Sequence, residues 1–142
     1  MNCTPFTLGP FQTNCYLVEH HDECWIIDAS FEPEPMIEAI RSRGLTPVAL
    51  LLTHAHVDHI AGIPAVREAF PDLPIHLHAA EHGWLQAPDL NLSAAMGVPV
   101  TTPPADHALE DGQTLHLGDV AWTVLHTPGH SPGGVTFHQA ES

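Results

Sequence analysis

Basic side chains are nearly absent from this sequence. Lys and Arg together number 3 against 17 Asp and Glu, so the formal net charge is −14 at pH 7. The three basic residues are Arg41, Arg43 and Arg67. A surface of this sign repels a phosphate backbone, which excludes nucleic acid as an expected partner. Bound divalent cations would offset part of the negative charge.

The sequence also lacks the segments that direct a chain to or across a membrane. No stretch approaches the ~20 consecutive apolar residues of a transmembrane helix. Residues 1–11 contain neither a basic start nor an apolar run of secretory length. The three cysteines are odd in number and have no Cys-x-x-Cys spacing, so free thiols are expected. We therefore expect a cytoplasmic protein with no membrane partner.

Length and composition indicate one globular domain over residues 1–142. A chain of 142 residues, 44% hydrophobic and 14% charged, can bury roughly 70% of its unfolded surface. The Pro-rich segment 99–104 is interpreted as a connector, because a whole second domain would not fit.

Histidine, by contrast, is abundant, with 13 residues. Three histidines and one aspartate lie within residues 54–59. The apolar run 47–52 predicts a buried strand, and the residues that follow it include His54, His56, Asp58 and His59. In extended backbone His54 and His56 point the same way. Imidazole and carboxylate bind zinc and similar metals, and open α/β sheets hold ligands at the carboxyl ends of strands. Burying these groups without partners would be costly, so a metal site is favoured over a chance cluster.

Other histidines fit no ligand pattern. Pairs such as His20 and His21, or His76 and His78, are compatible with chance in a chain so rich in histidine. Together with His82, His76 and His78 are therefore not expected to bind the functional metal.

Hydrophobic periodicity and turn residues predict a mixture of strands and helices. The first three strands form a meander at a sheet edge, and the helix before the metal-motif strand implies a right-handed βαβ crossover. The expected strands are 3–8, 14–19, 23–28, 47–52, 74–78, 114–117, 120–125 and 135–138, and the expected helices are 33–43, 64–70, 79–86 and 91–96.

Four segments resemble one known family. Residues 53–62, Thr-His-Ala-His-Val-Asp-His-Ile-Ala-Gly, look like the signature of the metallo-β-lactamase fold hydrolases. Residues 9–18, 91–93 and 126–134 are similar to the glyoxalase II-like (hydroxyacylglutathione hydrolase-like) branch of that family. The resemblance covers essentially the whole chain. It implies an α/β fold that is the N-terminal part of an αββα sandwich, with a mixed β-sheet and flanking helices.

The resemblance also implies a ligand set. His54, His56 and His130 would give one metal three nitrogen ligands and a position open to water, the usual arrangement of catalytic zinc. Asp58 and His59 alone would hold a second metal weakly, so one tight Zn²⁺ is expected, with Fe or Mn as alternatives. The implied reaction is hydrolysis of a small-molecule thioester, such as a hydroxyacyl-glutathione, by a zinc-activated hydroxide that Asp58 orients.

The roles expected for Asp28, His130 and His126 differ. Asp28 either caps the turn at Ala29 or, as the resemblance suggests, is a carboxylate close to the metals. The sharp turn expected at Pro128 and Gly129 can aim His130 over the sheet end. His126 has no role in the resembled family and is interpreted as a strand residue.

The resembled family continues beyond the position of Ser142, with an Asp that bridges two metals and a further metal-binding His. Neither has a counterpart here. Two alternatives to a thioester hydrolase therefore stay open: a persulfide dioxygenase-like iron enzyme, and a catalytically impaired metal-binding remnant. β-Lactam hydrolysis is less favoured, because no secretory signal is recognised.

We predict that the chain forms a homodimer or binds a partner that completes its fold. The strand 47–52 and its neighbours are apolar enough to be buried on both faces, yet we expect no second covering layer from this sequence. Sedimentation of the purified chain measures the association. A stable, soluble monomer at high concentration would contradict the prediction.

Overall fold

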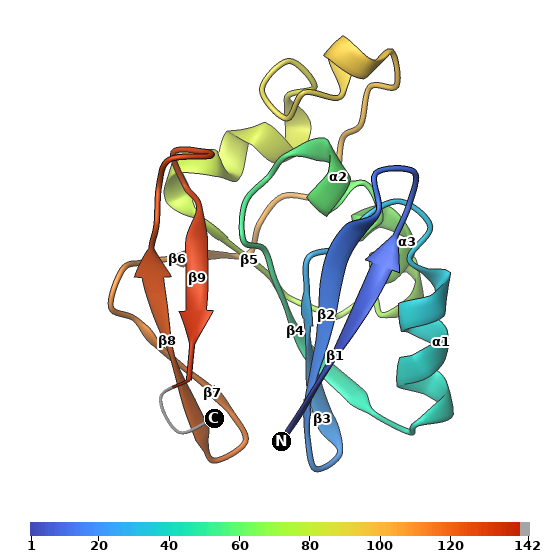
Figure 1. Cartoon of the computed structure of the whole chain (residues 1–142), viewed down its shortest axis with the longest axis vertical. Coiled ribbons are helices and arrows are strands. Elements are labelled where there is room, and N and C mark those ends of the chain that lie inside the picture. Colours follow the sequence, from blue (N-terminus) through green and yellow to red (C-terminus); the bar gives the residue numbers. More distant parts are fainter. Residues whose placement is uncertain (140–142) are drawn as a thin grey trace.

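A computed structural model describes residues 1–139 and confirms the α/β class. Its strands, helices and 3₁₀ helices are β1 (Asn2–Leu8), β2 (Thr13–His20), β3 (Glu23–Ile27), α1 (Glu34–Ser42), β4 (Thr46–Leu51), α2 (Val57–Ile60), α3 (Ile63–Ala69), β5 (Ile75–His78), η1 (Ala79–Gln86), η2 (Ala94–Met96), β6 (His107–Leu109), β7 (Thr114–Leu117), β8 (Val120–His126) and β9 (Val135–His138). The layers are helices, a six-stranded sheet and a three-stranded sheet (Figure 1).

The six-stranded sheet has the order β1-β2-β3-β4-β5-β6. Its first three strands pair antiparallel, which confirms the predicted meander at the sheet edge. The strands β3 and β4, which precede and follow α1 in the sequence, pair in parallel, so the βαβ unit is also confirmed. Pro35 lies in the first turn of α1, and Gly44 follows the helix with a φ of +66°, which is the usual placement of these two residue types at helix ends.

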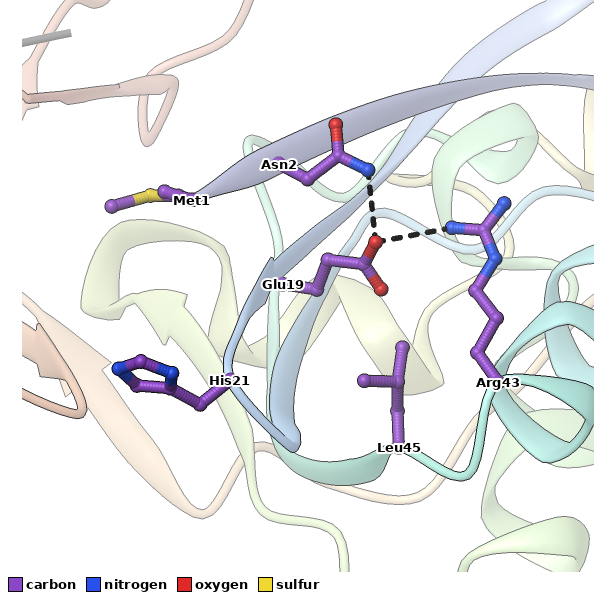
Figure 2. Close-up of a pocket in the computed structure, with 6 residues that line it drawn as sticks. All are labelled: Met1, Asn2, Glu19, His21, Arg43 and Leu45. Atoms are coloured by element: carbon purple, nitrogen blue, oxygen red, sulfur yellow. Dashed lines mark hydrogen bonds and ion pairs between the residues drawn. The ribbon is translucent and has the colours of Figure 1, made fainter.

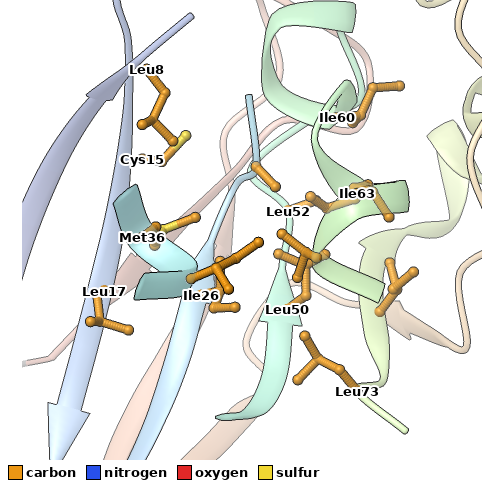
Figure 3. Packing of buried hydrophobic residues seen from close by; sticks show 14 of the residues in the cluster. Leu8, Cys15, Leu17, Ile26, Met36, Leu50, Leu52, Ile60, Ile63 and Leu73 are labelled. Atoms are coloured by element: carbon orange, nitrogen blue, oxygen red, sulfur yellow. The ribbon is translucent and has the colours of Figure 1, made fainter. Parts of the chain in front are cut away.

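One hydrophobic core lies between the six-stranded sheet and its helices. Residues of β2, β3 and β4 pack there against Met36 of α1 and Ile63 of α3 (Figure 3). Leu17, Ile26 and Leu50 are at most 1% exposed. Burying each such side chain contributes roughly 1.5–3 kcal/mol to folding. This packing fixes the position of β4, whose carboxyl end carries the metal motif.

The three-stranded sheet covers the other face of β2–β4. Trp25, Ile27 and Leu51 pack there against Leu117 and Trp122 of β7 and β8. The expectation that these strands would lack a second covering layer is therefore wrong, because the hairpin and the last strand form that layer. Within residues 1–139, β1 and β9 each pair on one side only. The association of the chain with a copy or partner stays a prediction.

Two elements escape the sequence patterns because they are short. The strand β6 has three residues, of which His107 and Ala108 are exposed, so no apolar run marks it. The helix α2 is a single turn, too short for a period of 3.6 residues to show. It starts where the N–H of Val57 donates to the carbonyl of Asn91 at 2.8 Å. Among the described residues, no helix is long and apolar enough to cross a membrane.

Gly62 allows two backbone segments to touch behind the metal motif. Its N–H donates to the carbonyl of Ala29 at 2.8 Å. A Cβ built at this position would lie 2.1 Å from the backbone oxygen of Ser30. Position 62 must therefore be glycine, because the chain after β3 passes too close for a side chain.

We predict that Gly62→Ala lowers the free energy of unfolding by about 1–3 kcal/mol, because the added methyl group overlaps backbone that cannot rotate away. Gly83→Ala is the matched control, since a Cβ there meets nothing within 4 Å. Urea denaturation of both variants measures the difference. Equal midpoints would show that residues 29–30 can move.

Candidate metal centre

Two loops meet at the carboxyl end of β4, and they carry the three predicted histidines. His54 and His56 lie between β4 and α2, and His130 lies between β8 and β9. Both connecting segments are in the upper half of Figure 1. One ligand atom from each histidine lies within 4.8 Å of those of the other two. Nδ1 of His56 is 3.0 Å from Nε2 of His130. The structure thus brings together side chains that are 74 positions apart in the sequence.

The surroundings of His54 test whether this cluster suits a cation. Its Nδ1 lies 3.0 Å from the hydroxyl of Thr53, whereas its Nε2 is buried and has no hydrogen-bond partner among the described residues. Burial lowers the pKa of His54 to about 4, and burial together with His130 lowers the pKa of His56. Neutral imidazole is the form that binds metals, and a cation would satisfy the orphaned nitrogen. The donor set therefore fits a zinc-like ion.

Asp28 connects this cluster to its supports. Its side chain is buried, with Oδ1 accepting from the N–H of Thr53 at 2.8 Å and Oδ2 accepting from the Thr53 hydroxyl at 2.7 Å. Oδ2 also lies 2.8 Å from Nδ1 of His59. Burial by itself would lower the pKa of His59, but the hydrogen bond to Asp28 and its charge raise it overall. Of the two readings of Asp28, the structure supports the carboxylate beside the site.

Asp58 and His59 lie next to each other on α2. Nε2 of His59 is 3.5 Å from Oδ2 of Asp58, and the hydroxyl of Thr13 donates to the same oxygen at 3.0 Å. In the described part of the chain, no third His, Cys or carboxylate joins this pair in a possible metal-binding group. These two side chains are beside the three histidines but form a smaller set of ligands.

Glu81 is a residue of the site that the sequence analysis missed. Its side chain is fully buried, and Oε1 accepts from the N–H of Ala55 at 2.7 Å. Oε2 accepts from the N–H of Gly133 at 2.6 Å. One carboxylate therefore binds both histidine loops. These partners are 26 and 52 positions away, and the local pattern of η1 contains no signal for them.

A cavity of about 250 Å³ opens beside the histidines. Its walls combine site residues with apolar side chains from two loops: Phe11, His56, Val57, Asp58, Leu92, Met96 and His130. The loop that carries Leu92 is held by Asn91, whose amide donates to the carbonyls of Trp84 and Val100 at 2.9 and 3.0 Å. The resemblance at residues 91–93 thus corresponds to a structural clamp on one wall of the cavity.

The remaining candidate histidines lie outside the three-histidine cluster. His82 donates to the carbonyl of Leu77 at 2.6 Å, and His126 stacks on His78 with ring centroids 4.3 Å apart. His76 lies beside His107. None of them belongs to a possible metal-binding group in the part of the chain that the structure describes.

Comparison with known sequences identifies relatives of this chain. A family model described as the metallo-beta-lactamase superfamily matches residues 8–142. The probable metallo-hydrolase YqgX of Bacillus subtilis (strain 168) is 43% identical over 132 residues, which are 92% of this chain and 62% of that protein. The hydroxyacylglutathione hydrolase of Xylella fastidiosa (strain 9a5c) is 38% identical over 103 residues, 72% of this chain and 32% of that protein. The chain thus spans less than two thirds of the length of these relatives.

Solved structures match the fold over almost the whole chain. The crystal structure of BLEG-1, a B3 metallo-β-lactamase, has a TM-score of 0.91 at 42% identity and covers 97% of this chain and 67% of that one. The structure of TTHA1623 in a di-iron-bound form has a TM-score of 0.81 at 41% identity, with the same coverage.

We predict that Glu81→Gln weakens metal binding by about 10–100-fold, because an amide cannot accept from both Ala55 and Gly133 and the two loops lose their common anchor. Competition with a chromophoric chelator measures the dissociation constant. Glu68→Gln, an exposed change on α3, is the matched control. Folded Glu81→Gln protein with unchanged metal affinity would show that Glu81 does not position the histidines.

Proposed function

Since the chain belongs to the metallo-β-lactamase superfamily, we propose that it is a metal-dependent hydrolase whose cation is held by His54, His56 and His130. The observation that carries the proposal is the convergence of three imidazoles, of which His54 has a buried Nε2 with no hydrogen-bond partner among the described residues. The similarity to the probable metallo-hydrolase YqgX supports the same class. Zn²⁺ is the first choice for this donor set, with Fe or Mn as alternatives.

The chemistry divides between the cation and the chain. Held by His54, His56 and His130, a divalent cation would supply Lewis acidity for a bound water and a substrate carbonyl. Asp58, fixed by the hydroxyl of Thr13, orients the attacking water with its carboxylate. Asp28 holds Nδ1 of His59, so that Nε2 faces Asp58. Asp58 and His59 together are the weaker, second cation site of the proposal.

A thioester is the substrate that we propose for this site. The similarity to a hydroxyacylglutathione hydrolase supports a thioester, and Phe11, Leu92 and Met96 provide an apolar wall for an acyl group. The described residues that line this cavity include no lysine or arginine. The carboxylates of glutathione therefore find no cationic partner in its described walls, and we infer that the acyl half of the substrate is what these walls recognise.

Two of the relatives favour other candidates. The similarity to BLEG-1, a B3 metallo-β-lactamase, favours a β-lactam as second candidate substrate. The di-iron form of TTHA1623 supports iron as a candidate metal, which a persulfide dioxygenase-like activity would use. A substrate panel separates these alternatives: a glutathione thioester, an uncharged short-chain thioester, a chromogenic β-lactam, and a persulfide with oxygen consumption recorded.

The panel is run on metal-free protein reloaded with Zn²⁺, Fe²⁺ or Mn²⁺. We expect thioester cleavage with zinc, faster for the uncharged thioester than for the glutathione one. Full metal loading without hydrolysis of either thioester or of the β-lactam would overturn the proposal and leave a metal-binding remnant, whereas hydrolysis of the β-lactam alone would replace the thioester with the second candidate substrate. Iron-dependent oxygen consumption would replace it with the dioxygenase-like reading.

We also propose that the protein is located in the cytoplasm. Cys3, Cys15 and Cys24 are free, and burial raises the pKa of Cys15 and Cys24 to about 12. Buried thiols that stay protonated suit a reducing cytoplasm. Cell fractionation tests this assignment.

We predict one tightly bound metal per chain. His56→Ala removes one of three ligands and should abolish tight binding, whereas His59→Ala should leave most of it, since His59 lies in the smaller ligand set. Elemental analysis after dialysis against a mild chelator counts the metal. A second retained metal that is lost in His59→Ala, or equal losses in both variants, would contradict the assignment.

A further inference from the structure

A second group of metal-binding side chains lies at the opposite end of the molecule. His20 and His21 are at the turn between β2 and β3, and Asp119 is in the turn between β7 and β8 (Figure 1). One ligand atom from each lies within 4.8 Å of those of the other two. Nε2 of His20 is 2.6 Å from Oδ1 of Asp119, and the rings of His20 and His21 are 4.2 Å apart.

The backbone at both turns holds these side chains in place. His21 has a φ of +57°, a left-handed conformation that few non-glycine residues adopt. Gly118 has a φ of +60°, and a Cβ there would lie 3.0 Å from Cδ2 of His20. The β7–β8 turn can approach His20 this closely because residue 118 is glycine. The side chain of His20 is only 14% exposed, so one donor of the group is well ordered.

The nearby cationic side chain, Arg43, does not compete with a metal ion for His20, His21 and Asp119. A hollow of about 430 Å³ lies beside His21, and Glu19 on its wall is bonded to Asn2 and Arg43 at 2.9 and 3.4 Å. Figure 2 shows that pairing, with His21 on the other side of the hollow. Arg43 is therefore committed to Glu19, and the chain has only two other basic residues to compete with a cation.

We propose that His20, His21 and Asp119 bind a divalent transition metal ion that links the two sheets. Two imidazoles and a carboxylate, completed by water, are ligands that zinc takes at about 2.0–2.2 Å. Ligand atoms around such an ion lie roughly 3.3 Å apart, which small side-chain rotations can reach from the observed positions. The ion joins the β2–β3 hairpin of one sheet to the β7–β8 hairpin of the other. Its role is structural, and it does not depend on the hydrolase proposal.

The experiment removes the catalytic ligands first. In a His54→Ala/His56→Ala background, we expect Zn²⁺ to bind in about one equivalent and to raise the Tm by about 5–10 °C at 100-fold excess over its Kd. Adding Asp119→Ala or His21→Ala should abolish both effects. His116→Ala, an exposed histidine change in the same hairpin, should leave them unchanged. Mg²⁺ should have no effect, because it prefers oxygen ligands.

Absence of zinc binding in the double variant, or binding that survives both Asp119→Ala and His21→Ala, overturns the proposal. Such a result would leave His20 and Asp119 as a plain ion pair between the sheets. Should the double variant not fold, the unmodified chain is titrated with excess zinc. A count that falls by one in Asp119→Ala and His21→Ala but not in His116→Ala supports the site, and an unchanged count rejects it.

Discussion

The buried carboxylate of Glu81 is the contact on which the metal centre depends. It accepts one backbone N–H from each of the two loops that carry the histidines, at 2.7 and 2.6 Å. A carboxylate without exposure to water is costly unless strong donors surround it, so both loops are needed to stabilise Glu81. The loops in turn depend on Glu81, because no other hydrogen bond among the described residues joins either loop to η1. Attachment of the two loops to η1 thus brings the candidate ligands together.

Thr53 is the second point at which the sheets and the site are joined. Its carbonyl accepts from the N–H of Val135 at 2.9 Å, which attaches the start of β9 to the end of β4. Its N–H and hydroxyl both donate to Asp28, and the hydroxyl also lies 3.0 Å from Nδ1 of His54. Asp28 in turn orients His59. One threonine therefore connects the packing of both sheets to two candidate ligands, His54 and His59.

Local patterns predicted much of the fold, and they pointed to histidines that the structure brings together. The run 47–52, the helix 33–43 and the histidine spacing at 54, 56 and 59 can be interpreted from neighbouring residues alone, and the elements lie where expected. What failed depends on distant contacts. Burial of Glu81, the choice between two roles for Asp28, and the covering of β3 and β4 by β7–β9 are decided by residues more than 20 positions away. Neither periodicity nor spacing contains that information.

The group of His54, His56 and His130 is more preorganised for a metal than the group of His20, His21 and Asp119. At the carboxyl end of β4, burial lowers the pKa of His54 and His56 and leaves Nε2 of His54 without a hydrogen-bond partner among the described residues, so a cation there satisfies a nitrogen that has no bond to lose and separates only the contact of His56 with His130. At the opposite end of the molecule, His20 is already paired with Asp119, whose side chain is 85% exposed. A cation must separate that pair and order an exposed carboxylate, which costs free energy. The same ligand chemistry therefore gives a preorganised centre at one end and a weaker, structural position at the other, and an acidic chain with three basic residues can accommodate both.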